Sequence, residues 1–169
     1  ALNRLKMMNR EFHGARYEIA VAAIFARAGF EIHFLDDEDK ASVIAKKHCE
    51  FIAEDPQSGV KIAVEAKSKS RKGVFYEEGE KSEENLKKGN VHNLLKKALQ
   101  KDVEGLPFFI FIDVNAPLDK EKSLEDVPWV KDILKNAEQQ QGTEGLPQKT
   151  KENFVAFTNH AYHYQEDKI

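Results

Sequence analysis

The strongest constraint on the fold of this 169-residue chain is a pair of strand candidates, residues 48–54 and 60–67, separated by five turn-forming residues. The turn reads Asp55-Pro56-Gln57-Ser58-Gly59, which is typical of a short hairpin loop. We therefore expect an antiparallel hairpin closed by a pair between Asp55 and Val60. Counting back along the two strands then gives the opposed pairs Glu50 with Glu65 and His48 with Lys67.

Alternation along the second strand puts Glu65 and Lys67 on the same face, because successive side chains of a strand point to opposite sides. Opposed carboxylates repel each other unless a cation lies between them. Hard oxygen ligands at this spacing suit Mg²⁺ or Mn²⁺, which bind through one or two carboxylates together with substrate phosphate. A register slip of one residue would separate Glu50 from Glu65, so this expectation depends on the length of the turn.

A helix is expected upstream, over residues 14–28, with Gly29 as its C-terminal stop. Residues 19–26 are apolar all round, which predicts a largely buried helix. Glu18 is then near the N-terminal end, where a carboxylate interacts favourably with the exposed amides. Two roles stay open for Glu18, a capping or surface residue and a group at the proposed metal site.

The rest of the chain predicts an α/β fold with a mixed sheet flanked by helices. Residues 91–100 show the apolar stripe of an amphipathic helix, and residues 106–114 form the continuous apolar run of a strand buried on both faces. A helix between two strands of one sheet provides the crossover that parallel pairing needs. The expected order is completed by a helix ending near residue 140, with Asp126 as a candidate cap, and by a late strand at 153–158, for which we expect an edge position.

This order of elements and acidic residues resembles the PD-(D/E)xK nuclease superfamily, which has the restriction-endonuclease-like fold with an αβββαβ core. The resemblance covers residues 9–115, and it implies metal-dependent cleavage of nucleic acid, usually DNA. It also implies roles for individual residues: Glu50 and Glu65 as the two acidic residues of the motif, Lys67 as its lysine, Glu18 as the helix carboxylate, and Glu50, Glu65 and the carbonyl of Ala66 as ligands of Mg²⁺ or Mn²⁺. The first acidic position of the family is more often Asp, and no proline precedes it here.

Charge is unevenly distributed along the chain. The formal net charge of −3 and a pI near 6.1 argue against a general polyanion binder. Immediately after the proposed site, however, residues 67–72 contain four positive charges, and residues 77–84 are strongly acidic. A basic segment in this place is expected to contact the phosphates of a nucleic acid, with DNA as the expected partner, without reading its bases. The expected contacts are Lys67, Lys69, Arg71 and Lys72.

The remaining features set the context. Cys49 is the single cysteine, so no intrachain disulfide can form and a cytoplasmic location is expected. No segment has the roughly 20 apolar residues of a membrane span, so no membrane partner is expected. The length suits one nuclease-like domain over residues 1–169, and the start at Ala1 without a Met suggests a processed or partial chain. A homodimer or a partner domain stays open.

Other polar residues are weaker site candidates. Asp113 at the end of the buried strand is more readily explained as a turn former than as a ligand. His160 and His163 have a metal-like spacing but lack a second pair of ligands. Two functional hypotheses follow for the chain: a metal-dependent nuclease, or a noncatalytic nuclease-like domain that binds nucleic acid or a protein partner.

Overall fold

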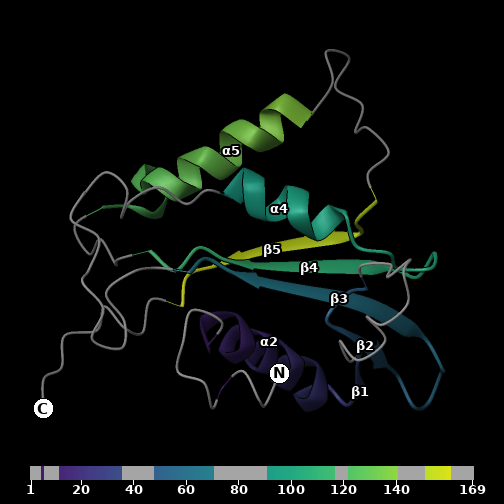
Figure 1. Ribbon diagram of the computed structural model, residues 1–169. Coiled ribbons are helices and arrows are strands. Elements are labelled where there is room, and N and C mark those ends of the chain that lie inside the picture. Colours follow the sequence, from purple (N-terminus) through teal and green to yellow (C-terminus); the bar gives the residue numbers. More distant parts are fainter. Residues whose placement is uncertain are drawn as a thin grey trace, which may run out of the picture.

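The computed structural model describes Leu5 and residues 12–35, 48–70, 91–116, 122–140 and 151–160. These residues form a five-stranded sheet with helices on both faces (Figure 1). The predicted α/β class, with a mixed sheet flanked by helices, is confirmed. The elements in chain order are α2 (Phe12–Arg27), β1 (Glu31–Phe34), β2 (Phe51–Glu54), β3 (Lys61–Ser68), α4 (Val91–Leu99), β4 (Phe108–Asp113), the 3₁₀ helix η2 (Leu124–Asp126), α5 (Pro128–Gln140) and β5 (Phe154–Thr158).

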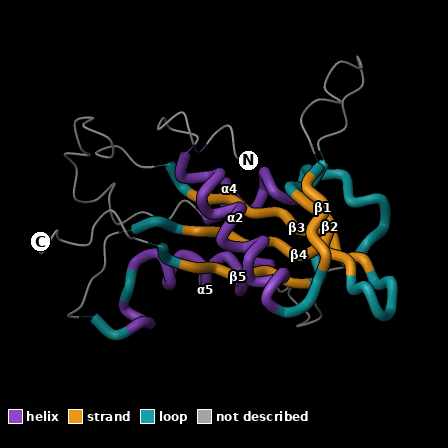
Figure 2. Tube along the Cα trace, turned by 90° about the horizontal axis from the view of Figure 1, so that it is seen from below, coloured by secondary structure: helices purple, strands orange, loops and turns teal. Residues whose placement is uncertain are grey.

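The strands follow the chain order β1-β2-β3-β4-β5 across the sheet. The pairs β1–β2 and β2–β3 are antiparallel, whereas β3–β4 and β4–β5 are parallel. Tight turns can join antiparallel neighbours, but the parallel pair β3–β4 needs a crossover, and α4 provides it. The predicted order of a helix, three strands, a helix and a strand is thus present over residues 12–113. The late strand β5 lies at the sheet edge, as predicted, and Figure 2 shows the strands side by side.

Two apolar layers hold the helices against the sheet. On one face α2 packs on the side chains of Val64 and Ala66 from β3, together with the aromatic ring of Phe51 from β2. On the opposite face α4 packs on Ala63 and on residues of β4, with Leu95 and Ala98 turned inward. Figure 1 shows α2 on one side of the sheet and both α4 and α5 on the other. The two faces of β3 therefore contact different helices.

The predicted register of the hairpin is confirmed. Phe51 pairs with Val64 and Glu54 pairs with Lys61, and the amide of Asp55 donates to the carbonyl of Val60 at 2.9 Å. The turn is closed by a hydrogen bond from the Gly59 amide to the Asp55 carbonyl at 2.8 Å. Gly59 has φ 71°, a left-handed conformation that favours glycine. The turn length thus sets which side chains share a face.

The expectation that His48 faces Lys67 is wrong. The regular pairing of β2 with β3 ends at Phe51, and the amide of Glu50 donates to the carbonyl of Val64 at 3.0 Å. The chain bends at this residue, and His48 instead forms an isolated parallel bridge with Asp102. Glu50 therefore stands at the point where the strand leaves the sheet.

Helix α2 differs from its prediction at the N-terminal end and in its burial. It begins at Phe12, two residues before the predicted start, so Glu18 lies in its second turn and does not cap it. Only one face of the helix is buried, and Ile24 is 59% exposed, although the sequence is apolar all round there. The C-terminal stop at Gly29 is confirmed, because this residue has φ 94° and its amide donates to the carbonyl of Ala26. Among the described residues, no helix is long and apolar enough to span a bilayer.

Candidate functional site

The candidate site lies on the α4 face of the sheet, where the pairing between β2 and β3 ends. Glu65 and Lys67 alternate with the inward-facing Val64 and Ala66 of the α2 face, so both polar side chains point toward α4. Glu50 approaches from the bend that precedes β2. The three residues of the predicted motif are therefore brought together, although Glu50 lies just outside the ladder.

The amine of Lys67 joins the two carboxylates. Its Nζ donates to Oε1 of Glu50 at 2.8 Å and also contacts Oε1 of Glu65. Glu65 is fully buried, whereas the side chains of Lys67 and Glu50 are 24% and 18% exposed. The ammonium group thus supplies the cation that the opposed carboxylates require, and the cluster opens to solvent on the side of Glu50 and Lys67.

Burial changes the acid–base behaviour of the cluster. Burial raises the pKa of the Glu65 carboxyl from its ordinary value of 4.5 to about 7, a shift that nearby Lys67 reduces and nearby Glu50 increases. For Lys67, burial alone would lower the pKa, but the charges of Glu65 and Glu50 outweigh it and raise the pKa above 10.5. Lys67 is therefore an ammonium at neutral pH and acts as a hydrogen-bond donor and a positive charge.

A second amine reaches the site from the residue segment after α4. Lys101 Nζ lies 3.4 Å from Oε1 of Glu65 and donates to the backbone carbonyl of His48 at 2.7 Å. Its side chain is 18% exposed. Lys101 thus connects the buried carboxylate to the segment that carries Glu50. Sequence reasoning missed this residue, because its only local signal is a lysine shortly after an amphipathic helix.

The donor set is compatible with a single hard cation. Glu65 Oε2 is buried, and no described residue donates a hydrogen bond to it. The backbone groups of β3 point alternately to its two neighbouring strands. The amide of Ala63 points to β4, and the carbonyl of Val64 points to Glu50. The carbonyl of Ala66, two residues after Val64, is therefore directed to the side of Glu50 as well. Within the described residues, no cluster of three or more His, Cys, Asp or Glu side chains is placed to hold a metal. A bound ion would therefore rely on Glu50, Glu65, the Ala66 carbonyl, water and substrate oxygens.

Glu18 is a buried residue of α2, the helix that packs on Val64 and Ala66 from the face of the sheet opposite to α4. Its Oε1 lies close to Gly14, since a Cβ at this glycine would be 3.8 Å from it. The expected role of Glu18 beside Glu50 and Glu65 stays a prediction.

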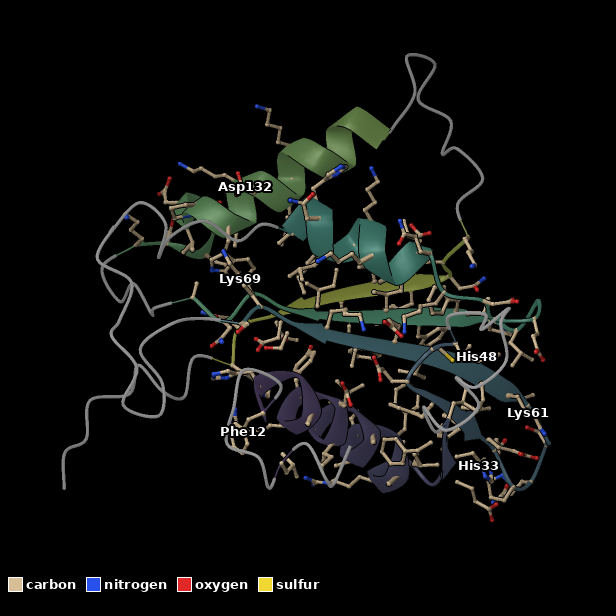
Figure 3. The ribbon with its side chains drawn as sticks, in the orientation of Figure 1. Phe12, His33, His48, Lys61, Lys69 and Asp132 are labelled. Carbon is tan, nitrogen blue, oxygen red and sulfur yellow. The ribbon has the colours of Figure 1, made fainter. Side chains whose placement is uncertain are left out.

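Of the predicted nucleic-acid contacts, Lys67 and Lys69 lie on the α4 face of β3 and its extension. The amide of Lys69 donates to the carbonyl of Asp113 at 2.9 Å, which continues the parallel pairing by one residue. Figure 3 shows Lys69 and His48 toward opposite ends of the sheet. Arg71 and Lys72, and the acidic segment 77–84, lie outside the described residues.

Asp113 has a structural role, as the sequence suggested. Its Oδ2 accepts from the hydroxyl of Ser68 at 2.7 Å, and its Oδ1 accepts from the amides of Asn115 and His160 at 3.3 and 2.7 Å. These bonds tie the ends of β3 and β4 to the segment after β5. Tyr17 of α2 adds a hydrogen bond to Thr158 at 2.7 Å. The polar residues at this end of the sheet thus fasten elements together.

Fold and site together define a mixed α/β protein with a buried carboxylate held by two lysine amines. In comparisons with known proteins, no family model matches the chain, and no curated protein and no solved structure matches it. The function is therefore argued from the geometry of the site.

Proposed function

We propose that this chain is a restriction-endonuclease-like nuclease that hydrolyses phosphodiester bonds, in DNA, with Mg²⁺ or Mn²⁺ as its cofactor. The proposal is carried by one observation: Glu65 is fully buried, one of its oxygens has no donor among the described residues, and Lys67 joins its other oxygen to Glu50. A buried carboxylate is costly unless it is paired and hydrogen-bonded, and buried carboxylates with strongly shifted pKa values cluster at functional sites. The order of helix, three strands, helix and strand supports the same class of fold.

The residues of the site have distinct tasks in this proposal. Glu50 and Glu65, with the carbonyl of Ala66, would hold the cation. The cation supplies positive charge next to the scissile phosphate and makes a neighbouring water more acidic. Lys67, held as an ammonium by the two carboxylates, donates hydrogen bonds to the attacking water or to a phosphate oxygen. Lys101 holds Glu65 through its ion pair and holds the segment before Glu50 through its hydrogen bond to the His48 carbonyl.

A noncatalytic nuclease-like domain that binds nucleic acid or a protein partner is the alternative. It is favoured by the position of the Lys67 ammonium between the two carboxylates, since this amine and that of Lys101 beside Glu65 already balance their charge without a metal. The described residues also offer no third acidic or histidine ligand beside them. On this reading the cluster is an internal ion-pair network that orients β2 and β3.

Calorimetric titration with Mn²⁺, together with a cleavage assay on plasmid and linear DNA, tests the proposal. The variants Glu65→Gln and Glu50→Gln are expected to lose metal binding and to reduce cleavage by at least about a hundredfold, because a neutral amide is a poor ligand for a hard cation. Glu54→Gln is the matched control, since Glu54 belongs to the same hairpin but forms its ion pair with Lys61 at the turn end. Wild-type protein that binds no Mn²⁺ and cuts no DNA or RNA would favour the noncatalytic alternative.

A further inference from the structure

A groove of about 480 Å³ lies between α4 and the extension of β3, on the same face of the sheet as the candidate site. It is lined by three lysines, Lys69, Lys96 and Lys97, and by Leu94 and three uncharged polar residues. Among the residues that the structure describes, no carboxylate lines it. The groove is therefore locally cationic on a chain whose formal net charge is −3.

The charges of α4 in the groove are accessible. Lys96 and Lys97 are both exposed, and neither forms an ion pair within the part of the chain that the structure describes. Lysines in the last turn of a helix also interact favourably with the helix dipole, which accounts for some of their placement. The dipole does not explain why Lys69, from a different element, faces the same space.

The groove leads toward the candidate site along both of its walls. On β3, Lys69 follows Lys67 by two residues and so shares its face. The other wall is formed by α4 and the residue after it. Its lining residues recur every three or four positions, at Asn93, at Lys96 or Lys97, and at Gln100. The next residue is Lys101, whose amine reaches Glu65. Seven residues of helix rise about 10 Å, which corresponds to roughly three phosphates of one strand at one charge per 3.4 Å.

We infer that this groove binds the phosphate backbone of the nucleic-acid strand that enters the candidate site, with Lys69, Lys96 and Lys97 as its cations. The inference rests on the proposed function for the direction of the strand. Ser70, Asn93 and Gln100 add hydrogen-bonding groups for phosphate or sugar oxygens, and none of the described lining residues is aromatic and able to stack on a base. Binding through the groove is therefore independent of base sequence.

The test measures binding without metal, in EDTA, by fluorescence anisotropy with two labelled DNA duplexes of unrelated sequence. The double variant Lys96→Gln with Lys97→Gln is expected to weaken binding of both duplexes about tenfold at 0.1 M salt, and to lower the slope of log affinity against log salt by about two. Lys131→Gln with Lys135→Gln on α5 is the matched control, with the same change in charge and an expected change below twofold. Thermal melting checks that both double variants are folded.

Each outcome separates this inference from the proposed function. Equal weakening by the two double variants would overturn the inference, because net charge alone would explain the binding. Competition by polyglutamate as effective as that by DNA would overturn it in favour of an acidic protein partner. Duplex binding through the groove in a protein that neither binds Mn²⁺ nor cuts DNA would leave the groove standing while the nuclease proposal fails. Cleavage and duplex binding that are both unchanged in the groove variants would overturn the groove inference and leave the nuclease proposal standing.

Discussion

The two faces of β3 bury side chains of different chemistry. Toward α2 the strand presents Val64 and Ala66 to a layer of aromatic rings, in which Phe25 makes edge-on contacts with Phe51 and Phe111 at centroid distances of 5.8 Å. Toward α4 the same strand presents Glu65, which is just as deeply buried as Val64. One strand thus contributes apolar packing on one side and a buried ionisable group on the other.

The difference has an energetic meaning. Aromatic pairs add stability beyond the burial of their area. A buried carboxylate, in contrast, lowers stability unless its partners and hydrogen bonds compensate for the lost hydration. The α2 face therefore stabilises a strand whose α4 face carries a costly group, which is the arrangement expected where a site is built on a rigid support. Removing a buried ring from the α2 face should therefore lower the free energy of unfolding, whereas replacing Glu65 on the α4 face by a neutral residue should raise it at higher pH.

The largest effect is expected on the α2 face. Phe51→Ala removes a fully buried ring that contacts both Phe25 and Phe34, so the free energy of unfolding should fall by about 3–5 kcal/mol. Urea unfolding monitored by circular dichroism measures it. Phe34→Ala is the control, because this ring is 44% exposed and should cost much less. A loss as small as that of Phe34→Ala would show that the aromatic layer is not what stabilises β3.

The next largest effect is a pH dependence on the α4 face. Because burial raises the pKa of Glu65 from 4.5 to about 7, the folded state holds this proton more tightly than the unfolded state, and stability is lost as pH rises from 4.5 through 7. Glu65→Gln has no proton to lose there, so its free energy of unfolding relative to wild type should increase by up to about 3 kcal/mol between pH 5 and pH 8.

Urea unfolding at a series of pH values in EDTA checks this dependence. Glu54→Gln again serves as the control, since Glu54 is partly exposed at the turn end of the hairpin. Parallel pH curves for wild type and Glu65→Gln would mean that Glu65 titrates in the folded protein as it does in the unfolded chain. In that case the contrast between the two faces would be one of composition alone.

Sequence reasoning reached the features that depend on local signals. The turn of five residues determined the hairpin register, and with it the shared face of Glu65 and Lys67. The apolar stripe of α4, the buried run of β4 and the late strand β5 were also predicted within a few residues. Each of these follows from periodicity or turn chemistry in a short stretch of chain.

The features that were missed depend on packing between distant segments. His48 was placed by extending the ladder, but the chain bends at Glu50 and meets Asp102, 54 positions away. Lys101 has no motif to identify it, because its role arises only where the end of α4 passes this bend.

A moderate effect is expected at Lys101. Lys101→Met removes the hydrogen bond to the His48 carbonyl and the amine beside Glu65, so the free energy of unfolding should fall by about 1–2 kcal/mol. Because the bond holds the segment before Glu50, hydrogen exchange of the Glu50 amide should accelerate as well. Lys101→Arg retains the charge and should restore most of the protection. Unchanged exchange in Lys101→Met would show that the bend is held by other contacts.

The smallest effect concerns the turn that assigns side chains to the two faces. Gly59→Ala introduces a Cβ at φ 71°. Apart from the two chain neighbours, no atom of the other described residues lies within 4 Å of this Cβ, so the cost is that of the left-handed backbone alone, about 1 kcal/mol. Gln57→Ala is the control, because the turn uses the backbone amide of Gln57, and its change should stay within about 0.5 kcal/mol. Urea unfolding measures both. A loss of several kcal/mol in Gly59→Ala would instead indicate a slipped register, since a shift by one residue would turn Glu50 away from Glu65 and mix the two faces.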